Sequence, residues 1–334
     1  MVLPYIVPLT RETAQAHFTE VKYLGKGSYG STSLLTDAHG NCIVRKRIDI
    51  TALSDMEREL CMNEIKIIGS VNHPFIVKYL GSYLEDNLLF ILTSYCKGGD
   101  LHHYISQKRK RNESIREGRI LKWLAQLLSA LKYLHKKHIL HRDLKSLNVL
   151  IDHDKTLKLC DFGVSKALNT TTDHTQTIIG TPYYFSPELI NGQEYSWPSD
   201  IWALGCLTHE LATFRTPFDG SKGMHELVRH IKHTPIPDLP KHYSSELNSL
   251  FKSMMFHDLR LRLSASELLS TDIMQGALRQ MLRDAECSIQ MHPSKAMTRA
   301  PLDNVLDSTI TGDSEMVSPR DVPIHGNTLG YQDI

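Results

Sequence analysis

The stretch His141-Arg142-Asp143-Leu144-Lys145-Ser146-Leu147-Asn148 lies near the middle of this 334-residue chain, and Asp161-Phe162-Gly163 begins eighteen residues after Asp143. The two stretches bring acids, a lysine and an amide into a short part of the sequence. Just upstream, apolar residues recur at spacings of 4, 3, 4 and 3, at Ile120, Leu124, Leu127, Leu131 and Leu134. That spacing predicts one buried face of an α-helix, so the polar stretch follows directly on a core helix.

The sequence upstream of this helix predicts a smaller, strand-rich half over residues 21–93. Strand-like residues occur at Val21–Leu24, Thr32–Thr36, Cys42–Ile48, Ile76–Leu80 and Leu88–Leu92. Ser54 and Glu57 have the spacing of a capping box, which predicts the start of a helix that runs to about Ile68.

The sequence downstream is mainly helical and predicts a larger second half. Helical patterns cover Ser199–Thr213, Gly223–Lys232, Ser244–Met255 and Ser264–Leu269. We therefore expect an α+β fold with two lobes that meet near residues 94–99, and a ligand site in the groove between them. The predicted parts are an extension at 1–20, the lobes at 21–93 and 100–274, and a tail at 275–334. Within the tail, Ala277–Met291 could form a short amphipathic helix, and 292–334 lacks periodicity and is expected to be mostly disordered.

Composition excludes several classes of protein. The formal net charge is only +1, which disfavours nucleic-acid binding by bulk charge. The six cysteines form no CxxC pair, so a reducing interior is expected rather than a disulfide framework or a zinc site. No apolar run is long enough for a membrane helix, and no signal peptide is recognisable. The sequence gives no sign of an oligomeric state.

Gly25, Gly27 and Gly30 form a G-x-G-x-x-G motif, whose glycines let backbone N–H groups approach phosphate oxygens. A dinucleotide-binding fold would need a helix at the third glycine and an acid about 20 residues on, where Asp49 lies. The residues from Ser31 to Thr36 favour a strand instead. A strand–turn–strand flap over a nucleotide triphosphate therefore fits better.

Taken together, these motifs resemble those of the eukaryotic protein kinases, over residues 21–274. The resemblance implies the bilobal protein kinase fold. Three further stretches resemble the NIMA-related (NEK) branch: Tyr95–Leu101, Gly180–Glu188 and Asp200–Cys206. Lys145, two residues after Asp143, is typical of serine/threonine kinases rather than tyrosine kinases.

The resemblance also implies roles for single residues. Asp143 would orient the substrate hydroxyl and accept its proton, and Lys145 would touch the transferring phosphate. Asn148 and Asp161 would hold two Mg²⁺ ions. Glu64 would pair with the ATP-binding Lys46. The expected ATP-binding residues are Leu24, Gly25, Lys26, Gly27, Ser28, Tyr29, Gly30, Ser31, Thr32 and Lys46.

Regulation by phosphorylation is a further implication. Arg142 precedes the catalytic aspartate, which in the family is typical of control by an activation-loop phosphate. Thr177 is the first candidate acceptor and Thr175 the second, with an upstream activating kinase as a partner. Glu188 and Arg262 would form a buried ion pair that anchors the segment.

The sequence thus predicts a serine/threonine kinase that uses ATP and Mg²⁺ and acts on serine or threonine of protein substrates, in the cytoplasm with cytoskeletal association. The alternatives are a nucleotide-binding pseudokinase scaffold and a kinase for a small molecule. Intact Lys46, Asp143, Asn148 and Asp161 disfavour the first, and the long segment from Asp161 to Glu188 disfavours the second. The basic run Lys108–Arg111 is interpreted as a solvated connection, with a nuclear signal or phosphate patch as alternatives.

Overall fold

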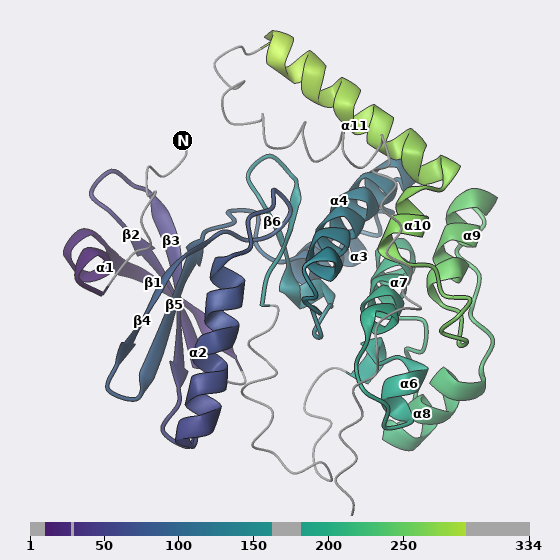
Figure 1. The fold of residues 1–334 in the computed structure, drawn as a ribbon. Coiled ribbons are helices and arrows are strands. Elements are labelled where there is room, and N and C mark those ends of the chain that lie inside the picture. Colours follow the sequence, from purple (N-terminus) through teal and green to yellow (C-terminus); the bar gives the residue numbers. More distant parts are fainter. Residues whose placement is uncertain (1–10, 28–29, 162–181, 292–334) are drawn as a thin grey trace, which may run out of the picture.

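The computed structural model of the chain describes residues 11–27, 30–161 and 182–291. A strand-rich lobe lies beside a larger helical lobe (Figure 1), which confirms the expected α+β class. The first lobe holds a five-stranded antiparallel sheet in the order β1-β2-β3-β5-β4. Its strands are β1 (Thr19–Gly27), β2 (Gly30–Thr36), β3 (Cys42–Asp49), β4 (Tyr79–Glu85) and β5 (Leu88–Ser94). The predicted disorder of 292–334 lies outside the described residues.

A helix covers each face of this sheet. Helix α2 (Asp55–Gly69) has the predicted capping box, in which Ser54 and Glu57 exchange hydrogen bonds. On the opposite face lie α1 (Arg11–His17) and Phe18, which the sequence did not predict. Successive residues of β5 alternate between two cores: Leu89 and Ile91 on the α2 side, and Phe90 and Leu92 on the α1 side.

The fourth strand differs from the prediction, which placed it at Ile76–Leu80. It begins at Tyr79 and runs to Glu85 instead. Ile76 forms an isolated parallel bridge with Leu159, and its side chain lies in the core of the helical lobe. These apolar residues therefore connect the two lobes and do not extend the sheet.

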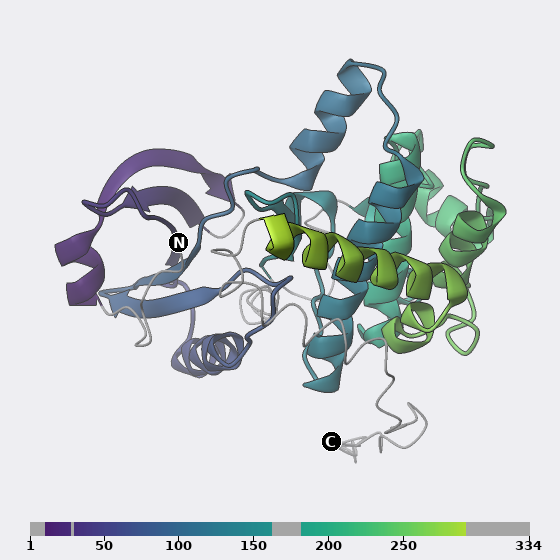
Figure 2. The same cartoon turned by 90° about the horizontal axis from the view of Figure 1, so that it is seen from above.

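The helical lobe is built around the buried α4 (Glu117–Lys136), which carries the predicted leucine face. The other helices are α3 (Leu101–Lys110), α6 (Pro187–Ile190), α7 (Trp197–Thr213), α8 (Met224–His233), α9 (Ser245–Met254), α10 (Ala265–Leu269) and α11 (Asp272–Met291). The four helices predicted after residue 199 are confirmed, with small differences at their ends. Helix α11 starts earlier than predicted and crosses the lobe over α4 (Figure 2). None of the described helices is long and apolar enough to span a membrane.

Two short strands, β6 (Val149–Ile151) and β7 (Leu157–Leu159), pair antiparallel next to a 3-10 turn at Ser146–Asn148. The sequence analysis did not predict either strand. Beyond the end of this ladder, the Cys160 N–H donates to the Asn148 carbonyl oxygen at 3.0 Å. The ladder therefore brings Asn148 close to Asp161, although thirteen residues separate them in the sequence.

Candidate active site

The glycine-rich stretch joins β1 and β2 in an antiparallel hairpin, in which Gly27 pairs with Gly30. This confirms the strand–turn–strand prediction; Ser28 and Tyr29 at the tip lie outside the described residues. The glycines differ in their surroundings. A Cβ atom at Gly30 would lie 1.7 Å from the Arg47 carbonyl oxygen, whereas one at Gly25 would meet nothing within 4 Å. Gly30 is therefore required by the packing of β2 on β3, and Gly25 leaves open space.

The remaining predicted ATP-binding residues lie on the strands that flank the turn. Leu24 and Lys26 are exposed on β1, and Ser31 and Thr32 are partly buried on β2. Thr32 is directly opposite Lys46 in the β2–β3 ladder. The hairpin thus places Thr32 next to the lysine that is expected to hold the phosphates.

Lys46 links the two lobes. Its Nζ atom lies 2.8 Å from Oδ1 of Asp161. Burial alone would lower the pKa of Lys46, but attraction to the Asp161 carboxylate outweighs it and raises the pKa. Lys46 therefore stays charged at neutral pH. Glu64 lies in α2, as predicted, but its side chain is outside the described residues, so its pairing with Lys46 stays a prediction.

Asp143 lies between a cation and an amide. Lys145 Nζ is 2.8 Å from both carboxylate oxygens of Asp143, and Asn148 Nδ2 donates to Oδ2 at 2.7 Å. The same Nδ2 donates to the Asp143 backbone carbonyl at 2.8 Å. The Asp143 side chain remains 41% exposed, so the carboxylate is fixed in direction but accessible to a substrate.

A buried carboxylate holds the backbone of this loop. Asp200, in the first turn of α7, accepts hydrogen bonds from the N–H groups of His141 and Arg142, at 3.0 and 3.1 Å. Arg142 has a φ of 68°, a left-handed conformation that is costly for a residue with a side chain. Burial would raise the pKa of Asp200, but the hydrogen bond from His135 and its charge lower it overall. Asp200 is therefore an ionised anchor for a strained loop.

Asp200 was named from the sequence only as part of the stretch Asp200–Cys206, which resembles the NEK branch. Its role as an anchor of this loop was not predicted. The signal was an acid at the start of a helix whose next seven residues, Ile201–Leu207, are apolar or glycine. Such an acid is buried, and a buried carboxylate needs hydrogen-bond donors from elsewhere in the fold.

A second buried carboxylate connects the loop to the segment before α6. Glu210 on α7 accepts hydrogen bonds from the hydroxyls of Ser146 and Tyr184, the former at 3.0 Å. Burial raises the pKa of Glu210, and burial together with the nearby Glu210 raises that of Tyr184. This contact between the loop at His141–Asn148 and the end of the segment from Asp161 to Glu188 was not predicted from the sequence.

The predicted ion pair of Glu188 and Arg262 is confirmed. Arg262 Nη1 lies 2.8 Å from Glu188 Oε1, and the two side chains are 0% and 3% exposed. Nη2 donates to the second carboxylate oxygen at 3.2 Å, and Ser199 Oγ donates to Oε1 at 2.7 Å. This bidentate pair ties α6 to the loop before α10.

The donor set near Asp161 suits a hard cation. Asn148 uses its amide nitrogen for Asp143, which leaves the amide oxygen as a ligand, and the Asp161 carboxylate is about half exposed. Such oxygens are the ligands that Mg²⁺ prefers. Among the described residues, no group of three or more His, Cys, Asp or Glu could hold a metal ion. The predicted acceptors Thr175 and Thr177 lie outside the described residues.

Comparison with known proteins agrees with this geometry. A family model for the protein kinase domain matches residues 18–274. The mouse serine/threonine-protein kinase Nek4 is 38% identical over 243 residues, covering 72% of this chain and 30% of the relative. Mouse Nek1 is 36% identical over 79% of the chain and 22% of the relative, and mouse Nek9 is 32% identical over 89% and 31%. The chain thus spans less than a third of these relatives. With its kinase motifs assembled on a two-lobed α+β fold, the chain belongs to the protein kinase family and is similar to its Nek members.

Proposed function

We propose that the chain is an ATP-dependent serine/threonine protein kinase, which transfers the γ-phosphoryl group of ATP to a serine or threonine hydroxyl of a protein substrate. The observation that carries the proposal is the Asp143 carboxylate, which is exposed and held between Lys145 and Asn148. The Lys46–Asp161 pair nearby supplies a cation for phosphates and an anion for a metal. The names of the relatives also support a serine/threonine kinase.

In the proposed reaction, the substrate oxygen forms a bond to the γ-phosphorus while the bond from that phosphorus to the β–γ bridging oxygen breaks. Asp143 orients the hydroxyl and accepts its proton. Lys145 offsets charge on the transferring group, and Lys46 binds the α- and β-phosphates. Asn148 and Asp161 would hold Mg²⁺, which supplies positive charge against the phosphate oxygens. Rate enhancement then comes mainly from positioning and from electrostatic stabilisation.

Substrate class and regulation are parts of the same proposal. The long segment between Asp161 and Glu188 supports a peptide substrate rather than a small molecule. We infer that a phosphate on Thr177, or on Thr175, pairs with Arg142 and that an upstream kinase adds it. Arg142 Nε is buried and has no hydrogen-bond partner among the described residues, which supports a missing anionic partner. We expect a cytoplasmic protein that associates with the cytoskeleton.

The test compares purified wild type with Asp143→Ala and Lys46→Arg, using labelled Mg-ATP and casein, followed by mapping of the labelled residues. We expect wild type to label serine and threonine. Asp143→Ala should lose at least about 100-fold in rate, the lower range for loss of a general base. Lys46→Arg should also lose phosphoryl transfer, because the α- and β-phosphates would no longer be held in position. Asp219→Ala is the matched control, because Asp219 is exposed on the same lobe and far from these motifs in the sequence.

Three results would count against the proposal. Wild-type rates in pure Asp143→Ala would refute the assigned base, and label on tyrosine alone would refute the substrate class. Stabilisation by ATP without transfer, in wild type and in Thr177→Glu alike, would instead indicate a nucleotide-binding scaffold.

A further inference from the structure

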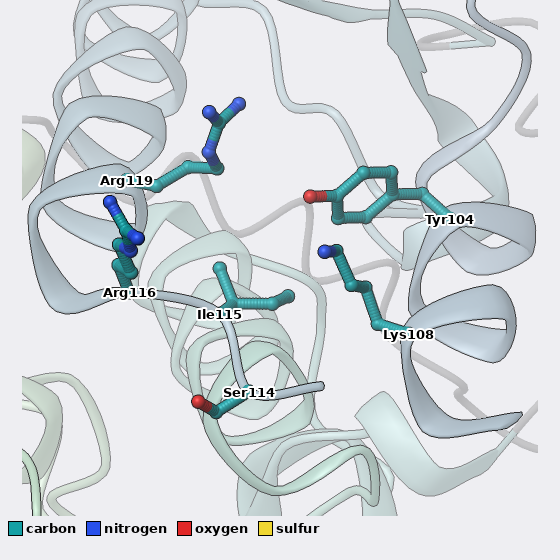
Figure 3. A pocket seen from close by; sticks show the side chains of 6 residues that line it. All are labelled: Tyr104, Lys108, Ser114, Ile115, Arg116 and Arg119. Carbon is teal, nitrogen blue, oxygen red and sulfur yellow. The ribbon is translucent and has the colours of Figure 1, made fainter. Parts of the chain in front are cut away.

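A basic cavity lies on the helical lobe, between the second half of α3 and the start of α4. Its volume is about 260 Å³, and it is lined by Tyr104, Lys108, Ser114, Ile115, Arg116 and Arg119. Figure 3 shows Tyr104 and Lys108 reaching from one helix towards Arg119 on the other. The lining holds three cationic side chains and two hydroxyls but no acid. None of the predicted active-site residues belongs to it.

A second cavity of about 310 Å³ adjoins the first and shares Tyr104, Lys108 and Arg119 with it. It adds two further cations, Arg111 and Lys155. Trp123 and Ile151 also line it, although both side chains are buried. We call the two cavities together the α3–α4 groove. Its accessible surface is strongly basic.

The nearby acids neutralise only part of this charge. Glu113 forms an ion pair with Lys108. Glu117, in the first turn of α4, accepts hydrogen bonds from the N–H and Oγ of Ser244, at 2.7 and 2.6 Å, and is engaged there. Within the described part of the chain, Arg116 and Arg119 form no ion pair with an acid. Arg116 is also the N-cap of α4 and gives that helix no side-chain cap, so the first-turn N–H groups add partial positive charge.

The cations are held in place before any ligand binds. The Arg119 guanidinium lies 5.6 Å from the Trp123 ring centroid, and Lys108 Nζ lies 5.9 Å from that of Tyr104. The two rings meet edge to face at 5.3 Å. Trp123 Nε1 donates to the Lys155 carbonyl at 3.2 Å, which fixes the ring. Such preorganisation lowers the entropy lost when an anion binds.

The walls of the groove are equally fixed by the rest of the lobe. The Tyr243 hydroxyl donates to the Ile115 carbonyl at 2.8 Å, and Tyr243 itself is buried. The loop between α3 and α4 is therefore tied to the segment before α9. A ligand in the groove would therefore bind a surface that the fold has already ordered.

We propose that the α3–α4 groove binds a phosphorylated serine or threonine in an extended segment of a partner protein. The phosphate would lie in the first cavity, and a neighbouring side chain of the segment would lie in the second. A phosphate carries nearly two negative charges and three acceptor oxygens. These match Arg116 and Arg119, which have no acidic partner among the described residues, better than a single carboxylate does. The volume of each cavity suits one side chain.

Other anionic partners fit less well. A membrane surface would need exposed apolar side chains beside the cations, but none of the large exposed apolar residues among those described borders the groove. A nucleic acid would need a basic stripe, whereas this charge gathers in two small adjoining cavities. A bare inorganic anion would leave the second cavity without an occupant.

The test uses fluorescein-labelled peptide pools with degenerate flanks around a central phosphoserine, serine or glutamate, and measures anisotropy with the full chain and without ATP. We expect the phosphoserine pool to bind at least 10-fold more tightly than the other two. The double variant Arg116→Gln/Arg119→Gln should lose that preference. Arg109→Gln should keep it, because Arg109 is an exposed cation on α3 that lines neither cavity.

A separate pair of variants tests the proposal even if the double variant fails to fold. Arg111→Gln and Lys155→Gln remove exposed side chains of the second cavity and should each weaken phosphoserine binding several-fold without loss of casein phosphorylation. Arg119→Lys should restore part of the binding that Arg119→Gln loses. Because no ATP is present, a failure of binding is distinct from a failure of the proposed kinase activity.

Four results would overturn the proposal. The first is equal binding of all three pools, and the second is a phosphoserine preference that survives in a folded Arg116→Gln/Arg119→Gln variant. The third is displacement of the peptide by an equal concentration of inorganic phosphate, which would indicate an adventitious ion only. The fourth is tighter binding of phosphatidylserine vesicles through the same arginines, which would indicate a membrane contact.

Discussion

Glu188→Gln should destabilise the helical lobe by about 3 kcal/mol. The substitution keeps the shape of the side chain but leaves Arg262 as a buried charge without a counter-charge. Breaking a buried pair from one side costs about 3–5 kcal/mol. Arg262 would keep its hydrogen bonds to the carbonyls of Phe256 and Pro198, both at 2.9 Å, and its place 5.0 Å from the Trp202 ring centroid. These remaining contacts favour the low end of the range.

The assay is urea unfolding of the full chain, followed by tryptophan fluorescence. Trp202 reports directly on this ion pair, because the Arg262 guanidinium lies over its ring. With a slope of about 3 kcal/mol per M for a domain of this size, the midpoint should fall by about 1 M. Arg260→Gln is the matched control. It breaks the exposed Arg260–Asp258 pair, which has a similar 2.7 Å contact, and should not move the midpoint measurably.

A double-mutant cycle separates charge burial from general disruption. Glu188→Gln combined with Arg262→Met removes both charges, so its loss of stability should be smaller than the sum of the two single losses. The reasoning fails if Glu188→Gln shifts the midpoint no more than Arg260→Gln does. It also fails if the single losses simply add.

Two further outcomes follow from the structure. Gly30→Ala should lower the thermal midpoint by the equivalent of about 1–3 kcal/mol, because the new Cβ meets the Arg47 carbonyl, whereas Gly25→Ala should leave it unchanged; equal shifts would contradict the contact analysis. Burial raises the pKa of Glu210, so its ionisation weakens the folded state as pH rises from the ordinary carboxyl range through the raised value. The midpoint of wild type should therefore decline over that interval relative to Glu210→Gln, and a difference between the two that is independent of pH would refute the assignment.

Local signals were enough to predict the elements that decide the fold. The capping box at Ser54 and Glu57 and the leucine face of α4 both depend on spacing along one element, and both are present. Helix α3 was not predicted from the sequence. Only its Leu101 and Ile105 are buried, and many of its other residues are histidine, lysine or arginine. Its basic last turn was interpreted as a solvated connection. A helix with one narrow buried edge has too weak a periodicity to be recognised.

Site residues were predicted from the sequence only where they belong to a recognised motif. The pairing of Lys46 with Asp161 and the anchoring of the catalytic loop by Asp200 depend on contacts across more than fifty residues of sequence. Spacing along the chain carries no information about such contacts. The same holds for Ile76, whose apolar side chain could equally have extended the sheet but joins the other lobe.

The anchoring of the His141 and Arg142 backbone by Asp200 also sets an order of assembly during synthesis. The strand-rich lobe and α4 are complete in the nascent chain before α7 emerges, because synthesis proceeds from the N-terminus. The loop that carries Asp143 contains a left-handed Arg142, which is unfavourable until the Asp200 carboxylate reaches it. A ribosome-bound chain that ends before α7 should therefore have a folded first lobe but no ordered catalytic loop, so that the chain acquires its chemistry only after most of the helical lobe has been made.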